Sequence, residues 1–127
     1  MPVQRLLRPS PRLDPESQEA WSRLTRLHSV GERRAAVLAL LLTPDSDRER
    51  RAWAEETRGV GTNAHVRRQT MLLPPAARLP ALHTLLQPLA TEPLAERQAL
   101  LMSVRRVMCA DGQVGPLDRL VWLAVRH

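Results

Sequence analysis

The histidines and the single cysteine are the side chains of this 127-residue chain that could serve metal or nucleophilic chemistry. The histidines are His28, His65, His83 and His127; no two of them stand four residues apart, and none is followed by Glu. A zinc site needs three or four suitably spaced ligands, and a zinc peptidase adds a Glu as its base. Cys109 belongs to the apolar side of a predicted helix, where a buried, inert thiol is expected. We therefore predict no catalytic residue, no metal ligand and no cofactor.

The most specific local motif is a short acidic turn, Ala110-Asp111-Gly112-Gln113-Val114, followed by Asp118. Its order of acid, glycine, aliphatic residue and acid matches the second half of a calcium-binding loop. The earlier ligand positions would fall on a valine and a cysteine, which offer no hard oxygen. A structural turn explains the motif better, because Gly112 suits a left-handed helix end and Asp111 can accept backbone N–H groups. Asp118 would lie in the first turn of a following helix.

The composition favours helix. The chain has no Phe and no Tyr, and its core must be built from the Leu, Val, Ala and Met that supply most of the 43% apolar residues. All 19 basic residues are Arg, and the net charge is +6. A chain of this charge prefers acidic partners, such as phosphate, anionic lipid or an acidic protein face.

The chain carries no pattern typical of secretion or membrane insertion. One cysteine cannot form an internal disulfide, and this fits a reducing cytoplasm. No signal-type apolar core follows the first residues. The longest apolar run, 35–42, is far below the roughly 20 residues of a membrane helix. We predict a cytoplasmic chain without a transmembrane segment.

Pro and Arg dominate residues 1–13, and we predict a flexible basic arm there that could contact anionic lipid. Residues 14–127 are predicted to form a single all-α domain, a compact bundle of about six short helices. The predicted starts are Asp14, residue 32, Ser46, Thr62 or Asn63, a position after the break at Pro74-Pro75, Thr91-Glu92-Pro93 and Pro116. The predicted stops are Gly31, Pro44, Gly59, Leu72, Pro88 and Asp111, and Pro80 is expected near the start of its helix.

The apolar spacing also predicts which side chains are buried. In the helix after Pro93, Leu94, Leu101, Val104 and Met108 form one stripe, with Ser103 and Arg106 opposite. The segment 32–43 contains the run 35–42, which is apolar all round, and is expected to be the central helix. The predicted core comprises Trp21, Leu24, Val37, Leu38, Leu41, Leu82, Leu86, Leu101, Val104, Met108, Leu120 and Leu123.

The turn at 110–118 resembles the "ADG-x-[IV]-x-x-x-E" turn of TerB-like helical domains. The segments before it, Arg78-Leu79-Pro80-Ala81-Leu82 and Gln87-Pro88-Leu89, extend the likeness. They are similar to the C-terminal helical region of bacterial membrane-associated zinc metallopeptidases of the HtpX-like group, where an "RLPLL" segment leads into the same turn. The resemblance covers roughly residues 30 to 127. The family's turn usually ends in Glu, and this chain has Asp118.

The resemblance implies a helical region without the protease domain, because the His-Glu-x-x-His motif of the peptidase is absent from this sequence. The implied function is a non-catalytic accessory or protein-interaction domain that regulates or extends a membrane-linked peptidase. Such a chain would lie in the cytoplasm, associated with the inner face of the membrane through its partner. The expected partner contacts are Arg67, Arg68 and Arg78.

Nucleic-acid binding is the alternative function. No acidic residue occurs between Thr57 and Thr91, whereas several arginines and two histidines do. A helix bearing Arg67 and Arg68 could serve as the basic recognition helix of a helix-turn-helix. Three tryptophans are too few to form a stacking platform for single strands.

Overall fold

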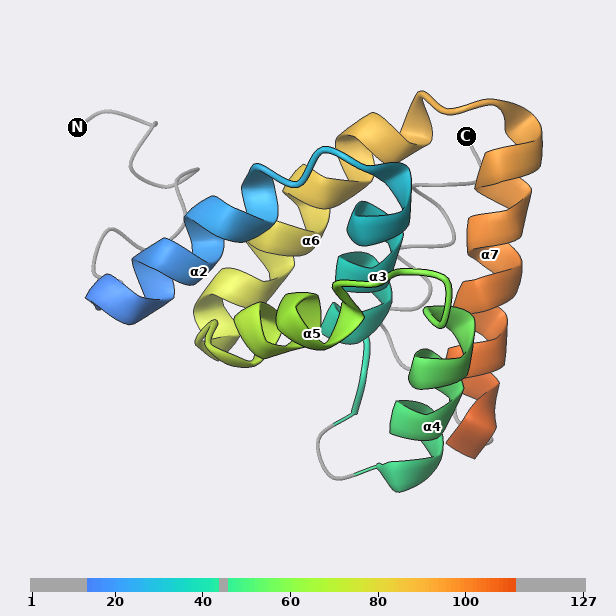
Figure 1. Ribbon diagram of the computed structural model, residues 1–127, viewed down its shortest axis with the longest axis horizontal. Helices are drawn as coiled ribbons and strands as arrows, with labels where there is room; N and C mark the ends of the chain where they lie inside the picture. Colours follow the sequence, from blue (N-terminus) through green and yellow to red (C-terminus); the bar gives the residue numbers. More distant parts are fainter. Residues whose placement is uncertain (1–13, 44–45, 112–127) are drawn as a thin grey trace.

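The computed structural model describes residues 14–43 and 46–111, and within these ranges every regular element is a helix (Figure 1). The predicted all-α class is confirmed. The elements are α2 (Pro15–Thr25), α3 (Val30–Leu40), α4 (Asp47–Glu56), α5 (Asn63–Met71), α6 (Pro75–Ala90), α7 (Leu94–Met108) and the 3-10 turn η1 (Cys109–Asp111).

Three of these helices begin at a side-chain cap. Asp14, Ser29 and Ser46 precede α2, α3 and α4, and each accepts a hydrogen bond from the backbone N–H three residues further on. Such a cap satisfies one of the N–H groups that a helix start leaves without a partner. Asp14 and Ser46 lie at predicted starts. Ser29 was not predicted, although Ser29-Val30-Gly31-Glu32 is a capping-box sequence and the Ser29 hydroxyl donates to the Glu32 carboxylate.

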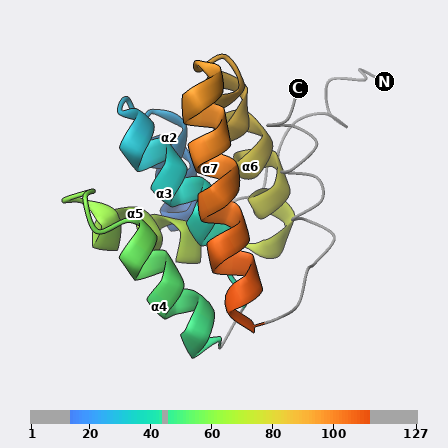
Figure 2. The same cartoon turned by 90° about the vertical axis from the view of Figure 1, so that its right-hand side faces the viewer.

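Helix α3 forms the centre of the fold (Figures 1 and 2). Its residues 35–40 are all buried, as the apolar run predicts. Helices α5 and α6 pack on α3, and α2 covers α5 and α6. Helices α4 and α7 pack on each other and also contact α3. The fold thus has two groups of helices, α2–α5–α6 and α4–α7, joined through α3.

Several helix boundaries that were predicted from Gly and Pro differ in the structure. Gly31 does not interrupt a helix; it lies in the first turn of α3, where a Cβ would come within 3.4 Å of a Val60 methyl group. Helix α3 ends at Leu40, before Pro44. Pro80 and Pro88 both lie inside α6, which continues to Ala90. Burial of the apolar side of α6 against α2 and α3 outweighs the loss of two backbone donors.

The buried face of α7 is rotated about the helix axis relative to the predicted stripe. Leu94 is exposed and Ser103 is buried, together with Leu100, Val104, Val107 and Met108. Ser103 tolerates burial because its Oγ accepts a hydrogen bond from Nη2 of Arg34, at 3.3 Å. The expectation of a buried Cys109 is also wrong, since this free cysteine is exposed.

Most of the predicted core is confirmed. The buried members are Leu24, Val37, Leu38, Leu41, Leu82, Leu86, Val104 and Met108. Trp21 and Leu101 are half-buried and pack against this core. Trp53 of α4, which is not among the predicted core residues, is 3% exposed and donates its Nε1–H to the Ala35 carbonyl at 3.0 Å.

Several predictions lie outside the described residues. They concern the basic arm 1–13, the helix from Pro116, the core residues Leu120 and Leu123, and the turn residues Gly112 and Asp118.

Candidate functional site

Of the turn predicted at 110–118, the structure describes only residues 110 and 111. Helix α7 ends at Met108 and is continued by the 3-10 turn η1, which closes at Asp111. Turn η1 packs against α4 as well as α7. The helix therefore stops within three residues of its predicted stop, and the roles of Gly112 and Asp118 stay predictions.

Arg67 is held in place by an aromatic ring. It lies on α5, is half-buried, and carries its guanidinium 5.8 Å from the ring centroid of Trp53 on α4. A guanidinium at this distance is attracted by the negative face of an indole. Trp53 is itself held by its hydrogen bond to the Ala35 carbonyl, so Arg67 contacts a ring that belongs to the core. Arg68, the next residue, is exposed.

Arg78 has a structural role that the sequence analysis did not anticipate. From α6 it donates to the carbonyl of Thr70 at 3.1 Å and to the carbonyl of Leu40 at 3.2 Å. These carbonyls belong to the last turns of α5 and α3, where backbone acceptors run short of helical donors; the Thr70 carbonyl also accepts from the Leu73 N–H at 3.3 Å. Burial lowers the pKa of Arg78, although a guanidinium stays charged at neutral pH. Arg78 thus ties α6 to α3 and α5. Of the three predicted contact residues, Arg67 and Arg68 lie together on α5, and Arg78 lies on α6.

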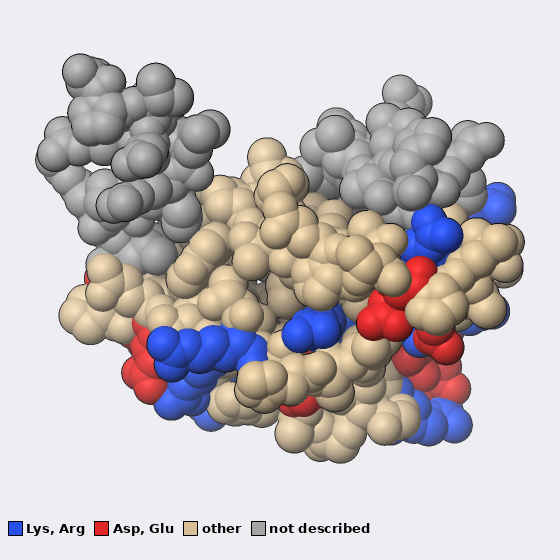
Figure 3. Space-filling model, turned by 90° about the horizontal axis from the view of Figure 1, so that it is seen from above, with Lys and Arg blue, Asp and Glu red and all other residues tan. Residues whose placement is uncertain are grey.

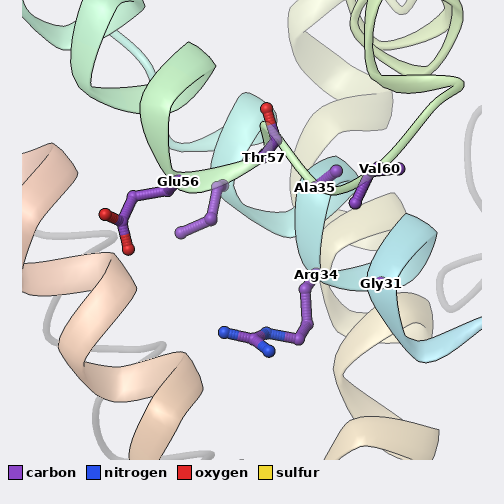
Figure 4. A pocket seen from close by; sticks show the side chains of 7 residues that line it. Gly31, Arg34, Ala35, Glu56, Thr57 and Val60 are labelled. Carbon is purple, nitrogen blue, oxygen red and sulfur yellow. The ribbon is translucent and has the colours of Figure 1, made fainter.

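A small hollow lies where α3 meets the end of α4 (Figure 4). It encloses about 260 Å³ of space, in part open to solvent, and its charged lining residues are Arg34 and Glu56. Glu56, whose side chain is 15% exposed, forms an ion pair with Arg106 of α7 at 2.8 Å. Arg34 lies 4.0 Å from the Glu96 carboxylate, also on α7. The two ion pairs join α7 to both α3 and α4.

One residue that lines the hollow, Arg34, carries a polar atom without a hydrogen-bond partner. Nε of Arg34 is buried and forms no hydrogen bond within the protein. The two charged lining residues, Arg34 and Glu56, are opposite in sign, and each has an ion-pair partner on α7. Sequence reasoning missed this cluster, although an arginine next to the all-apolar segment 35–42 is a signal of partial burial.

Residues 14–43 and 46–111 contain no group of three or more His, Cys, Asp or Glu side chains placed to hold a metal ion. No helix within these ranges is both long enough and apolar enough to cross a bilayer.

Comparison of the chain with protein-family models, with curated proteins and with solved structures finds no match. The fold and the contacts above therefore define the class of this protein as an all-α helical domain. The likeness of residues 30 to 127 to the TerB-like region of HtpX-like peptidases stays a prediction from the sequence.

Proposed function

We propose that this chain is a non-catalytic helical domain that binds an acidic face of a protein partner through Arg67 and Arg68. The observation that supports it best is the contact of Arg67 with Trp53. That contact orients a half-buried guanidinium next to the exposed Arg68 before any partner binds. A pre-oriented guanidinium loses less conformational entropy when it forms a two-pronged pair with a carboxylate.

The partner that the sequence favours is a membrane-associated zinc metallopeptidase of the HtpX-like group. The support is the resemblance of residues 30 to 127 to the non-catalytic region of those peptidases. Under this proposal the chain regulates or extends the peptidase from the cytoplasmic side of the membrane. The basic arm 1–13 adds contact with anionic lipid.

Nucleic-acid binding is the second candidate, because the segment 57–91 contains no acidic residue. The structure lowers the number of arginines that this segment can offer to phosphates. Arg78 is engaged with backbone carbonyls, and Arg58 forms an ion pair with Glu55. Arg68 and the half-buried Arg67 remain. Two phosphate contacts give weak binding, with a salt dependence about one quarter of that of a protein making eight contacts.

Affinity purification of the tagged chain from its own cells, with and without nuclease treatment, separates the two candidates. The proposal predicts that a membrane zinc peptidase is recovered in stoichiometric amount after nuclease treatment, as identified by mass spectrometry. Recovery of nucleic acid that nuclease removes, with no stoichiometric protein, would contradict the proposal. It would then favour the second candidate.

A further inference from the structure

The exposed side chains of α5 and of the start of α6 change in character along the chain. On α5 up to residue 68 they belong to Ala64, His65 and Arg68, with Arg67 half-buried beside them. From residue 71 to residue 79 every exposed side chain is apolar, and the residues are Met71, Pro75, Ala76 and Leu79. Met71 is the most exposed of them among the large hydrophobic residues, at 69%. A basic part of this surface is therefore followed by an apolar part.

The basic and apolar parts adjoin on the outward side of α5. Met71 stands three residues after Arg68 and four after Arg67, so it lies one helical turn from both arginines. The inward side of α5 is buried, because this helix packs on α2 and α3. A partner that reaches Arg67 and Arg68 therefore also meets Met71.

The charge of the two arginines is not balanced within the part of the chain that the structure describes. Helix α5 contains no acidic residue. Neither Arg67 nor Arg68 forms an ion pair there, whereas the exposed arginines of α2 and α7 and Arg58 each pair with a Glu. The surface that complements α5 in charge is therefore acidic.

We propose that the partner segment bound by α5 is both acidic and apolar: its carboxylates pair with Arg67 and Arg68, and an apolar side chain of the same segment packs on Met71. This inference rests on the proposed function and specifies the chemistry of the partner. Arg and Met are both enriched at the centres of protein interfaces. The unbranched side chain of Met adapts to the shape of the apolar group that it meets.

A protein segment fits this surface better than a membrane or a nucleic acid does. Membrane surfaces are bound by clusters of about four to eight basic residues, and α5 offers two arginines. On the face that Figure 3 shows, the arginine side chains lie in separate groups with uncharged surface between them. Phosphates of a nucleic acid would pair with the arginines but make no use of the exposed Met71.

Selection of phage-displayed random linear peptides on the immobilised full chain tests the chemistry of the partner. Peptides selected by the wild type are expected to be enriched in Asp and Glu, with an apolar residue at a fixed distance from an acid. Arg67→Gln with Arg68→Gln is expected to abolish the enrichment in acids. Met71→Gln is expected to keep the acids and to lose the apolar position.

Fluorescence anisotropy with the most enriched peptide measures the size of the effect. Met71→Gln is expected to raise the dissociation constant about fivefold, because part of one apolar side chain is no longer buried. Met102→Gln is the matched control, since Met102 is also an exposed methionine, at 48%, and lies on α7. It is expected to leave the dissociation constant unchanged. Circular dichroism confirms that each variant folds.

The outcomes separate this inference from the proposed function. Enrichment in acids without an apolar position would overturn the inference alone, and so would equal effects of Met71→Gln and Met102→Gln. No enrichment in acids relative to the double arginine variant would contradict the proposed function as well. Binding of the wild type to vesicles of phosphatidylserine and phosphatidylcholine that Met71→Gln weakens would assign this surface to a membrane, and would also overturn the inference.

Discussion

At the scale of single residues, the structure separates arginines that hold the fold from arginines that face outward. Arg78 donates to two backbone carbonyls that lie 30 residues apart in the sequence, at Leu40 and Thr70. Arg68 is exposed. A hydrogen bond from a charged, half-buried donor to a backbone carbonyl at a helix end stabilises a fold more than an exposed charge does.

Arg78→Met is therefore expected to lower the free energy of unfolding by about 2 kcal/mol, because it removes both hydrogen bonds and keeps the aliphatic stem. Urea unfolding followed by circular dichroism measures the change. The control, Arg68→Met, is expected to change stability by less than about 0.5 kcal/mol. Equal effects of the two substitutions would show that the contacts of Arg78 do not hold the helices together.

Asp14 gives a prediction about pH. The hydrogen bond from the Ser17 backbone N–H holds the pKa of Asp14 below its ordinary value of 3.8. A carboxyl whose pKa is lower in the folded state stabilises the fold above pH 3.8. The stabilisation is lost as pH falls through the folded-state pKa. Asp14→Asn keeps a capping oxygen but does not titrate. Wild type is therefore expected to be more stable than Asp14→Asn at pH 7, and this difference is expected to vanish in acid.

Thermal unfolding of both proteins from pH 7 down to pH 2 measures this difference. A difference that is constant across the whole range would show that the charge of Asp14 has no part in the cap.

At the scale of the elements, α6 is unusual because it is long and contains prolines in its interior. Pro80 supplies no backbone N–H, so the carbonyl four residues earlier loses its helical partner. The Thr84 hydroxyl donates to the carbonyl of Pro80 at 2.9 Å, which adds a local contact at this point. Packing against α2 and α3 keeps the helix continuous.

Pro80→Ala is expected to raise the free energy of unfolding by about 1 kcal/mol. The restored helical hydrogen bond outweighs the greater entropy of the unfolded chain. Pro75→Ala is the matched control, since Pro75 stands at the first position of α6, where a missing N–H costs nothing. Urea unfolding of both variants measures the change in the free energy of unfolding. A lower stability of Pro80→Ala would mean that packing of the proline ring itself stabilises α6.

The elements also show what the sequence predicts well and what it does not. The starts of α2, α4 and α7 follow from Asp14, Ser46 and Pro93, which act locally. The error at Pro80 has a tertiary cause, because packing of α6 on α2 and α3 offsets a local penalty. The error at Gly31 has a local cause, since the capping box of Ser29 and Glu32 that starts α3 was overlooked. The burial of Ser103 depends on a hydrogen bond from Arg34, 69 residues away, which no local pattern contains.

At the scale of the whole molecule, α3 joins the α2–α5–α6 group to the α4–α7 group. The apolar run 35–42 was sufficient to predict this central helix, because a segment that is apolar all round must be covered on every side. The candidate site was less predictable. Arg67 was singled out for its charge, but its contact with Trp53 depends on how α4 and α5 are brought together. The role of Arg78 depends on where α3 and α5 end.

The central claim is that Arg67 and Arg68 bind an acidic protein partner. Its most direct test compares two tagged double variants, Arg67→Gln with Arg68→Gln and Arg48→Gln with Arg51→Gln. Both lose two positive charges, and Arg48 and Arg51 are exposed on α4. The measured quantity is the amount of the membrane peptidase recovered after nuclease treatment, relative to wild type. We predict at least a tenfold loss for the α5 variant and recovery close to wild type for the α4 variant. Equal recovery with both variants would contradict the claim.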